Sequence, residues 1–190
     1  MTKTNGNTLS SYLSSKYIVC HSNATTRDGA FRELLELLAL KHGIGDIDAV
    51  FGDFVKREDD HDTIVANGVA IPHVRTDSIS KLLIAILTSE AGIEYSAGHP
   101  PVKLILMILS PVDNPALYLE VLSLLAEICN NEGIADIVSK LDTVEAIWSF
   151  FDRGEVTLPD FVLARHIMRT DPIALQENDT LKDAIDVFVR

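Results

Sequence analysis

Hydrophobic residues follow a helical spacing in two early segments of the chain. The first, which Thr25 or Thr26 can cap and Gly43 ends, carries four apolar residues on one helical face: Phe31, Leu34, Leu35 and Leu38. A second helix is predicted from a cap at Asp46 to Arg57, with an apolar face of Ala49, Val50, Phe54 and Val55. These spacings predict two amphipathic helices in the first third of the chain.

Short, continuous apolar runs separate the helical segments, and their lengths fit buried strands. They cover residues 17–20, 82–87 and 102–109, with a loop predicted over 90–101 in which Ile93 and Tyr95 alternate as a short edge segment. Asn114-Pro115 marks the start of a long helix, because a capping side chain precedes a proline at the first helical position. Shorter helices are predicted at about 132–140 and 143–152. Strands alternating with helices predict an α/β protein whose sheet is covered on both faces.

Composition and charge narrow the classes of function. The chain has 190 residues and a net charge of −12, which argues against nucleic acids and anionic membranes as partners, because phosphates would be repelled. No apolar run reaches membrane-spanning length and no leader-like segment opens the chain, which predicts a cytoplasmic protein. Cys20 and Cys129 lack a metal-binding spacing and are interpreted as reduced core thiols. No metal or cofactor is predicted.

The sequence Ile71-Pro72-His73 carries the candidate chemistry. Proline fixes its own φ and restricts the residue before it, so the segment is expected to be extended, with His73 held at a strand end or edge. A histidine so placed acts as a nucleophile, because much of it is neutral at cellular pH, or serves as a buried or capping residue. These residues alone leave both interpretations open.

Two polar stretches flank this segment. Residues 58–62, Glu-Asp-Asp-His-Asp, have the composition of a solvated acidic loop, and no converging second ligand suggests a metal at His61. After His73, residues 75–78 are predicted to form a polar turn.

The stretch NGVAIPH, residues 67–73, resembles the GIAIPH signature of the enzyme IIA domains of the bacterial phosphotransferase system, in the fructose/mannitol/nitrogen-regulatory class. Arg57-Glu58 and Thr63 precede the histidine by the family's sixteen and ten residues. The stretches TSEAGIEYSAGHPPVKLILMILSP and NPALYLEVLSLLAEI follow the family pattern, so the resemblance covers residues 8–152. It implies a three-layer α/β/α sandwich around a central mixed β-sheet.

The resemblance also implies the roles of individual residues. His73 would accept a phosphoryl group from the histidine-containing phosphocarrier protein, and Arg57 would stabilise the phosphate with its forked guanidinium. Thr63, Asn67 and Tyr118 are the expected substrate-binding residues. For Thr63, capping or turn formation is an equal alternative to donating its hydroxyl to phosphate. The implied activity is that of a phosphotransferase component that carries phosphohistidine.

Two departures from the family pattern bear on function. Mannitol-type members have a second histidine where this chain has Tyr118, and a phenol carries no positive charge near neutral pH. Val74 stands where a small residue usually follows the histidine, and its branched side chain is expected to crowd an approaching donor.

Residues 153–190 have a different character, a turn-rich linker followed by a segment that resembles the start of a cystathionine-β-synthase-type (CBS) module. This resemblance rests on Ile167-Met168, Asp171-Pro172-Ile173 and a capped helix from Asp179-Thr180; a plain helical extension is the alternative. The chain is therefore expected to be part of a longer protein, with a CBS module or a transporter beyond it. The tail is expected to pack either on the main domain or on a second copy, which would make a homodimer. Three functions stay open: a regulatory phosphoryl acceptor, a sugar-transport phosphocarrier, and a sensor that is never phosphorylated.

Overall fold

A computed structural model describes residues 12–131 and 133–152. The predicted linker and CBS-like segment, residues 153–190, lie outside the described residues. The strands are β1 Leu13–Val19, β2 Ile64–Ala66, β3 Val69–Ala70, β4 His73–Thr76, β5 Leu83–Ile93 and β6 Val102–Pro111. The helices are α1 Arg27–His42, α2 Ile47–Asp60, α3 Pro115–Cys129, α4 Ile134–Ser139 and α5 Val144–Asp152.

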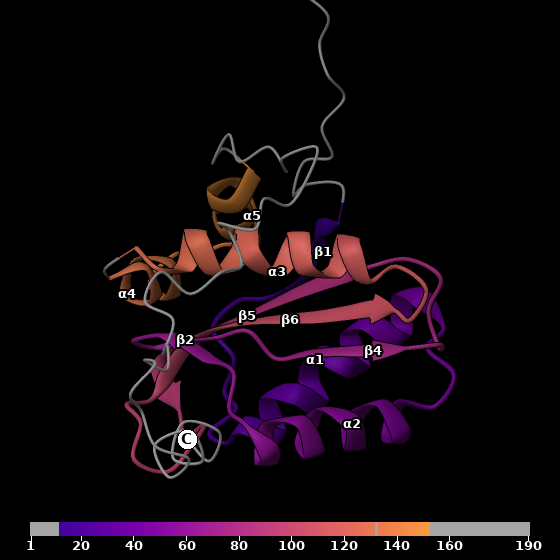
Figure 1. Cartoon of the computed structure of the whole chain (residues 1–190). Helices are drawn as coiled ribbons and strands as arrows, with labels where there is room; N and C mark the ends of the chain where they lie inside the picture. Colours follow the sequence, from indigo (N-terminus) through magenta and orange to yellow (C-terminus); the bar gives the residue numbers. More distant parts are fainter. Residues whose placement is uncertain (1–11, 132, 153–190) are drawn as a thin grey trace, which may run out of the picture. The chain divides into compact units, whose positions relative to one another are not determined.

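One mixed sheet forms the middle of the domain. Its order is β1-β5-β6-β3-β2, and β4 continues the line of β3 along the same edge of β6. The pairings of β1 with β5, and of β3 and β4 with β6, are parallel, whereas β5–β6 and β2–β3 are antiparallel. Helices α1 and α2 cover one face and α3, α4 and α5 the other (Figure 1). The predicted α/β/α sandwich with a central mixed sheet is confirmed.

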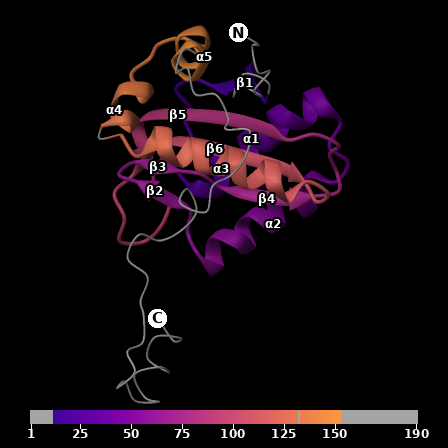
Figure 2. The same ribbon diagram turned by 45° about the horizontal axis from the view of Figure 1, so that its top comes forward.

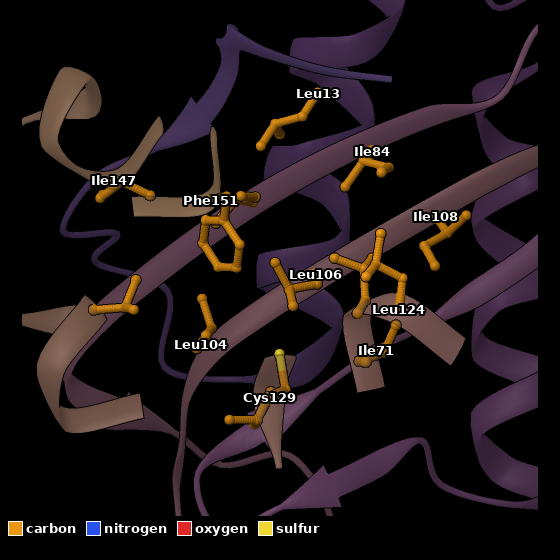
Figure 3. Packing of buried hydrophobic residues seen from close by; sticks show 14 of the residues in the cluster. Leu13, Ile71, Ile84, Leu104, Leu106, Ile108, Leu124, Cys129, Ile147 and Phe151 are labelled. Atoms are coloured by element: carbon orange, nitrogen blue, oxygen red, sulfur yellow. The ribbon is translucent and has the colours of Figure 1, made fainter. Parts of the chain in front are cut away.

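The central strands are apolar on both sides because each face of the sheet has its own core. Along β6, Leu104, Leu106 and Ile108 point to the α3 side, where Figure 3 shows them packed near Leu124, Cys129 and Phe151. The alternate residues Ile105, Met107 and Leu109 pack under α1 and α2. A strand buried on both faces has no polar side to alternate with, which explains the unbroken apolar run in the sequence.

The helix starts follow the sequence closely. The side chains of Thr26, Asp46 and Asn114 accept hydrogen bonds from the backbone N–H three residues on, at 3.2, 2.9 and 3.2 Å. Gly43 ends α1 with φ at 63°, a left-handed conformation that suits glycine. These capping residues confirm the predicted helix starts, since a cap is a local interaction.

Three predicted loops are partly regular structure. Helix α2 runs on to Asp60, so residues 58–60 are helical rather than loop, and Glu58 is buried with 4% exposure. Strand β4 extends through Arg75 and Thr76, where a turn was predicted. Strand β5 extends to Ile93, into the predicted loop over 90–101. In each case pairing or packing with another segment extends the element, which local composition does not reveal.

Figure 2 shows α3 lying over the sheet, on the face opposite α2, and α2 packs against β4. This arrangement brings the start of α3 and the end of α2 to the edge of the sheet where β4 begins. Within residues 12–131 and 133–152, no helix is long and apolar enough to cross a membrane.

Candidate functional site

His73 is the first residue of β4 and lies opposite Ile108 of β6. The carbonyl of the preceding Pro72 accepts a hydrogen bond from the Ile108 N–H at 2.9 Å, so the Ile71-Pro72-His73 segment is tied to the central strand. Within the described part of the chain, β4 pairs with β6 alone, which leaves its other side at the sheet edge. His73 is half-buried there, on a backbone with little freedom.

The two ring nitrogens of His73 have different environments. Nδ1 lies 2.8 Å from the carbonyl oxygen of Ile71, and since a carbonyl can only accept, Nδ1 carries the hydrogen. In the neutral ring Nε2 therefore has the free lone pair. Burial lowers the pKa of His73, the bond to Ile71 opposes this, and the charge of Arg57 lowers the pKa further. The net pKa is below 6.5, which favours the neutral, nucleophilic form.

Tyr118, in the first turns of α3, lies against this ring. The His73 and Tyr118 ring centroids are 5.6 Å apart with the planes tilted by 52°. Burial raises the pKa of Tyr118, although the charges of Arg57 and Arg75 act to lower it. The phenol is therefore neutral near neutral pH, and the structure places it beside His73, while a substrate-binding role for Tyr118 stays a prediction.

Arg57 reaches the same edge from the last turn of α2. Its side chain is exposed, and its Nη1 donates a long, 3.4 Å hydrogen bond to the backbone carbonyl of His61. Its charge is close enough to lower the pKa of both His73 and Tyr118, after the larger effect of burial on each. The structure thus brings Arg57, His73 and Tyr118 together from α2, β4 and α3.

Arg75 is a further cation at this edge that the sequence analysis placed in a turn. It lies two residues after His73 on β4, so both side chains project from the same face of the strand. It is exposed, and its charge acts on Tyr118. The spacing of two residues from His73 could have indicated that Arg75 shares its face of a strand. The sequence analysis missed this because it predicted a turn at Arg75.

Thr63 lies close to the site but its hydroxyl is already engaged. Thr63 Oγ1 donates to Glu58 Oε1 at 2.6 Å, and it is 3.2 Å from the hydroxyl of Tyr95. The backbone N–H of Thr63 also donates to Glu58, at 2.9 Å, and its carbonyl accepts from Ile71 N–H at 3.0 Å. Direct donation from Thr63 to phosphate stays a prediction, and the bonds observed are of the turn-forming kind.

Asn67 is not brought to His73. It precedes Gly68 in the turn between β2 and β3, and the Gly68 carbonyl accepts from the N–H groups of Lys103 and Leu104. His73 lies opposite Ile108, five residues further along β6 than Lys103, which corresponds to about 16 Å at about 3.3 Å per residue. A substrate-binding role for Asn67 stays a prediction that this placement does not support.

The expectation that Val74 crowds an approaching donor is wrong. Its side chain is 8% exposed and packs in the core beneath α1 and α2. Successive residues of a strand point to opposite faces, so Val74 points away from the face that His73 and Tyr118 share. For the site, Val74 is therefore a packing residue.

A model of the family described as phosphoenolpyruvate-dependent sugar phosphotransferase system, EIIA 2, matches residues 11–154. The fructose-specific EIIA component of Haloferax volcanii is 31% identical over 123 residues, which are 64% of this chain and 80% of that protein. The nitrogen regulatory protein IIA-Ntr of Neisseria meningitidis has a similar structure, with a TM-score of 0.67, 25% identity, and coverage of 74% of this chain and 97% of that one.

IIA mannitol of Escherichia coli shares the fold, with a TM-score of 0.62 at 17% identity over 73% of this chain and 98% of that one. The family match spans all of the described residues and includes the edge where His73, Arg57 and Tyr118 meet. This chain therefore belongs to the EIIA 2 family of the phosphoenolpyruvate-dependent sugar phosphotransferase system.

Proposed function

We propose that this domain accepts a phosphoryl group on Nε2 of His73 from the histidine-containing phosphocarrier protein, in the cytoplasm. The observation that carries the proposal is the 2.8 Å hydrogen bond from His73 Nδ1 to the Ile71 carbonyl. It fixes the tautomer in which Nε2 is unprotonated, and the lowered pKa keeps the ring neutral. A nucleophile is thereby prepared without a separate base.

In the transfer, the lone pair of Nε2 attacks the phosphorus of the donor's phosphohistidine. The new Nε2–P bond forms as the donor's P–N bond breaks, and that electron pair returns to the donor's histidine nitrogen. The hydrogen stays on Nδ1 of His73 and remains hydrogen-bonded to the Ile71 carbonyl, which stabilises the positive charge that the ring gains. Positioning and charge stabilisation then account for most of the catalysis.

Positive charge near the phosphate comes from Arg57 and Arg75. Both side chains are exposed at the edge that carries His73, in a chain whose net charge is −12. A guanidinium stays charged at all physiological pH values and can donate to two phosphate oxygens at once. Arg57 would stabilise the transferring phosphoryl group directly, with Arg75 adding positive potential on the Tyr118 side of the ring.

The proposed role is regulatory, with phosphorylated and unphosphorylated forms reporting metabolic state to a partner or an attached domain. It is supported by the neutral Tyr118 at the position where mannitol-type members have a titratable histidine. A transport carrier must pass phosphate on rapidly, which favours a second charged group beside the phosphohistidine. Rapid onward transfer would identify a sugar-transport carrier instead.

The test is phosphorylation with labelled phosphoenolpyruvate, enzyme I and the phosphocarrier protein. The native chain should acquire acid-labile, alkali-stable label, whereas His73→Ala should acquire none. His99→Ala is the matched control, because His99 is exposed on the loop after β5 and should leave labelling unchanged. Arg57→Ala should label on the same residue, but slower by roughly two powers of ten. Label that persists in His73→Ala, or a native chain that takes none, would overturn the proposal.

A further inference from the structure

Glu58 is a buried carboxylate in the last turn of α2, next in sequence to Arg57. It is 4% exposed, although the residues that follow it are exposed. Both carboxylate oxygens are used: Oε1 accepts from Thr63 Oγ1 at 2.6 Å, and Oε2 accepts from Thr63 N–H at 2.9 Å. A carboxylate is buried in this way only where its hydrogen bonds replace those of water.

The contacts of Thr63 lead from this carboxylate to the candidate nucleophile. The Thr63 carbonyl accepts from Ile71 N–H at 3.0 Å, and the Ile71 carbonyl accepts from His73 Nδ1 at 2.8 Å. Every link is a hydrogen bond of 3.0 Å or less within the domain, and Thr63 and Ile71 are both buried. Ile71 therefore links Thr63 to the His73 ring: its N–H donates to the Thr63 carbonyl, and its own carbonyl, in the next peptide unit, accepts from Nδ1.

Further contacts surround Glu58 and hold the end of α2 in place. The Tyr95 hydroxyl lies 3.2 Å from Thr63 Oγ1, and its ring packs edge-on against Phe31 of α1. Arg27 pairs with Asp59 at 3.0 Å, on the exposed side of the same helical turn. The end of α2 is thus held between α1 and the start of β2, and Arg57 lies in that fixed turn.

We propose that Glu58 is the positioning residue of the site: its carboxylate clamps Thr63 and so sets both the tautomer of His73 and the location of Arg57. The catalytic importance of this clamp rests on the proposed function, but its effect on the His73 ring does not. Glu58 itself never touches the phosphate. Thr63 acts in this scheme through Ile71, not as a phosphate donor.

The readout is the tautomer of His73, measured by ¹H–¹⁵N spectra of imidazole nitrogens in the unphosphorylated protein. The native spectrum should show the hydrogen on Nδ1. Glu58→Ala removes both hydrogen bonds of the clamp, and Thr63→Val removes the one from the hydroxyl while the backbone N–H bond stays. We expect each variant to give a mixture of tautomers and to slow phosphorylation by roughly one to two powers of ten, with the larger effect in Glu58→Ala. Thr63→Ser keeps the hydroxyl and should restore both properties.

Two controls separate positioning from general destabilisation. Glu58→Gln should retain the native tautomer, because the amide can accept from Thr63 N–H and donate to Thr63 Oγ1. Asp46→Ala removes the cap at the opposite end of α2, where Asp46 Oδ1 accepts from Ala49 N–H at 2.9 Å. It should lower stability while the His73 tautomer and the phosphorylation rate stay native.

If Glu58→Ala does not fold, the Thr63→Val and Thr63→Ser pair decides the question alone. Folded variants without the clamp that keep the native tautomer would overturn the proposal. So would a Thr63→Val variant that transfers phosphate slowly with an unchanged tautomer, since Thr63 would then act on the phosphate directly. A native chain that takes no phosphate would defeat the proposed function, yet the tautomer measurements would still test the clamp.

Discussion

At the residue scale, the chemistry of His73 depends on two opposing effects. Burial disfavours the charged ring and lowers the pKa, whereas the hydrogen bond from Nδ1 to Ile71 favours the charged form. Burial is the larger effect, and the charge of Arg57 acts in the same direction. The His73 ring is therefore neutral at cellular pH, and its free lone pair lies on Nε2.

This balance predicts the pH dependence of phosphorylation. The midpoint of His73 titration, followed by its ring ¹³C or ¹⁵N shifts and assigned by its loss in His73→Gln, should lie below 6.5. The phosphorylation rate should be constant above that midpoint and fall below it, because a protonated Nε2 has no lone pair to attack. Since the folded pKa is lowered, the unfolded chain binds the proton more readily, and this histidine's contribution to stability is lost as pH falls through the folded pKa. A midpoint at or above 6.5 would contradict the argument.

Sequence reasoning found His73, Arg57 and Tyr118, because the signature and its spacing lie in the linear order of residues. It missed Glu58, which was assigned to a solvated acidic loop. Val50, Phe54 and Glu58 are spaced by four and are all buried, so the helical period did carry the signal. What the sequence could not show is the partner: the hydrogen bonds of Thr63 and the enclosure by Tyr95 make burial of that charge acceptable.

At the scale of elements, helix starts were predictable and strand lengths were not. A capping side chain accepts from a backbone N–H only three residues away, so Thr26, Asp46 and Asn114 could be recognised as caps from the local sequence. The ends of β4 and β5 depend on pairing with β6, which is distant in sequence from β4 and follows β5 across a loop. Local composition therefore predicted a turn at Arg75 where the structure has a strand.

The cap of α3 gives a prediction at this scale. Asn114→Ala removes the side-chain acceptor of the Leu117 N–H and should lower the free energy of unfolding by about 1 kcal/mol. Urea unfolding measures this change. Asn130→Ala is the matched control at the other end of α3, where the Asn130 side chain makes no hydrogen bond to the described residues, and it should change stability by less than about 0.5 kcal/mol. Equal effects of the two substitutions would show that the Asn114 side chain adds nothing to the helix.

At the scale of the whole molecule, the fold brings together groups that are far apart in sequence. The alternation of apolar runs and helices was sufficient to predict the class, a sheet covered on both faces. It did not predict that β3 and β4 share one edge of β6, because hydrophobic period carries no information on strand order. That shared edge determines which residues lie near His73: Arg57 from α2, Tyr118 from α3 and Arg75 from β4.

The charge of the groups around His73 bears on whether the molecule passes phosphate on rapidly or holds it as a signal. In onward transfer, negative oxygens of donor and acceptor crowd together, and each lost charge-assisted contact costs about 2–4 kcal/mol, or roughly two to three powers of ten in rate. Tyr118 contributes a neutral phenol beside the ring, with its pKa raised by burial. We therefore expect slow phosphate exchange in both directions.

Tyr118→His tests this expectation, with exchange measured from the phosphocarrier protein to this domain and in reverse. An imidazole next to His73 would bind a proton as the phosphoryl group approaches, since negative phosphate oxygens favour the charged ring and outweigh the opposing effect of Arg57 and Arg75. Both rates should rise in Tyr118→His. Tyr118→Phe, the control, keeps the ring packing at 5.6 Å without gaining charge and should be no faster than the native chain. If Tyr118→His is no faster in either direction, Tyr118 is a packing residue, and its neutrality gives no reason to favour a regulator over a carrier.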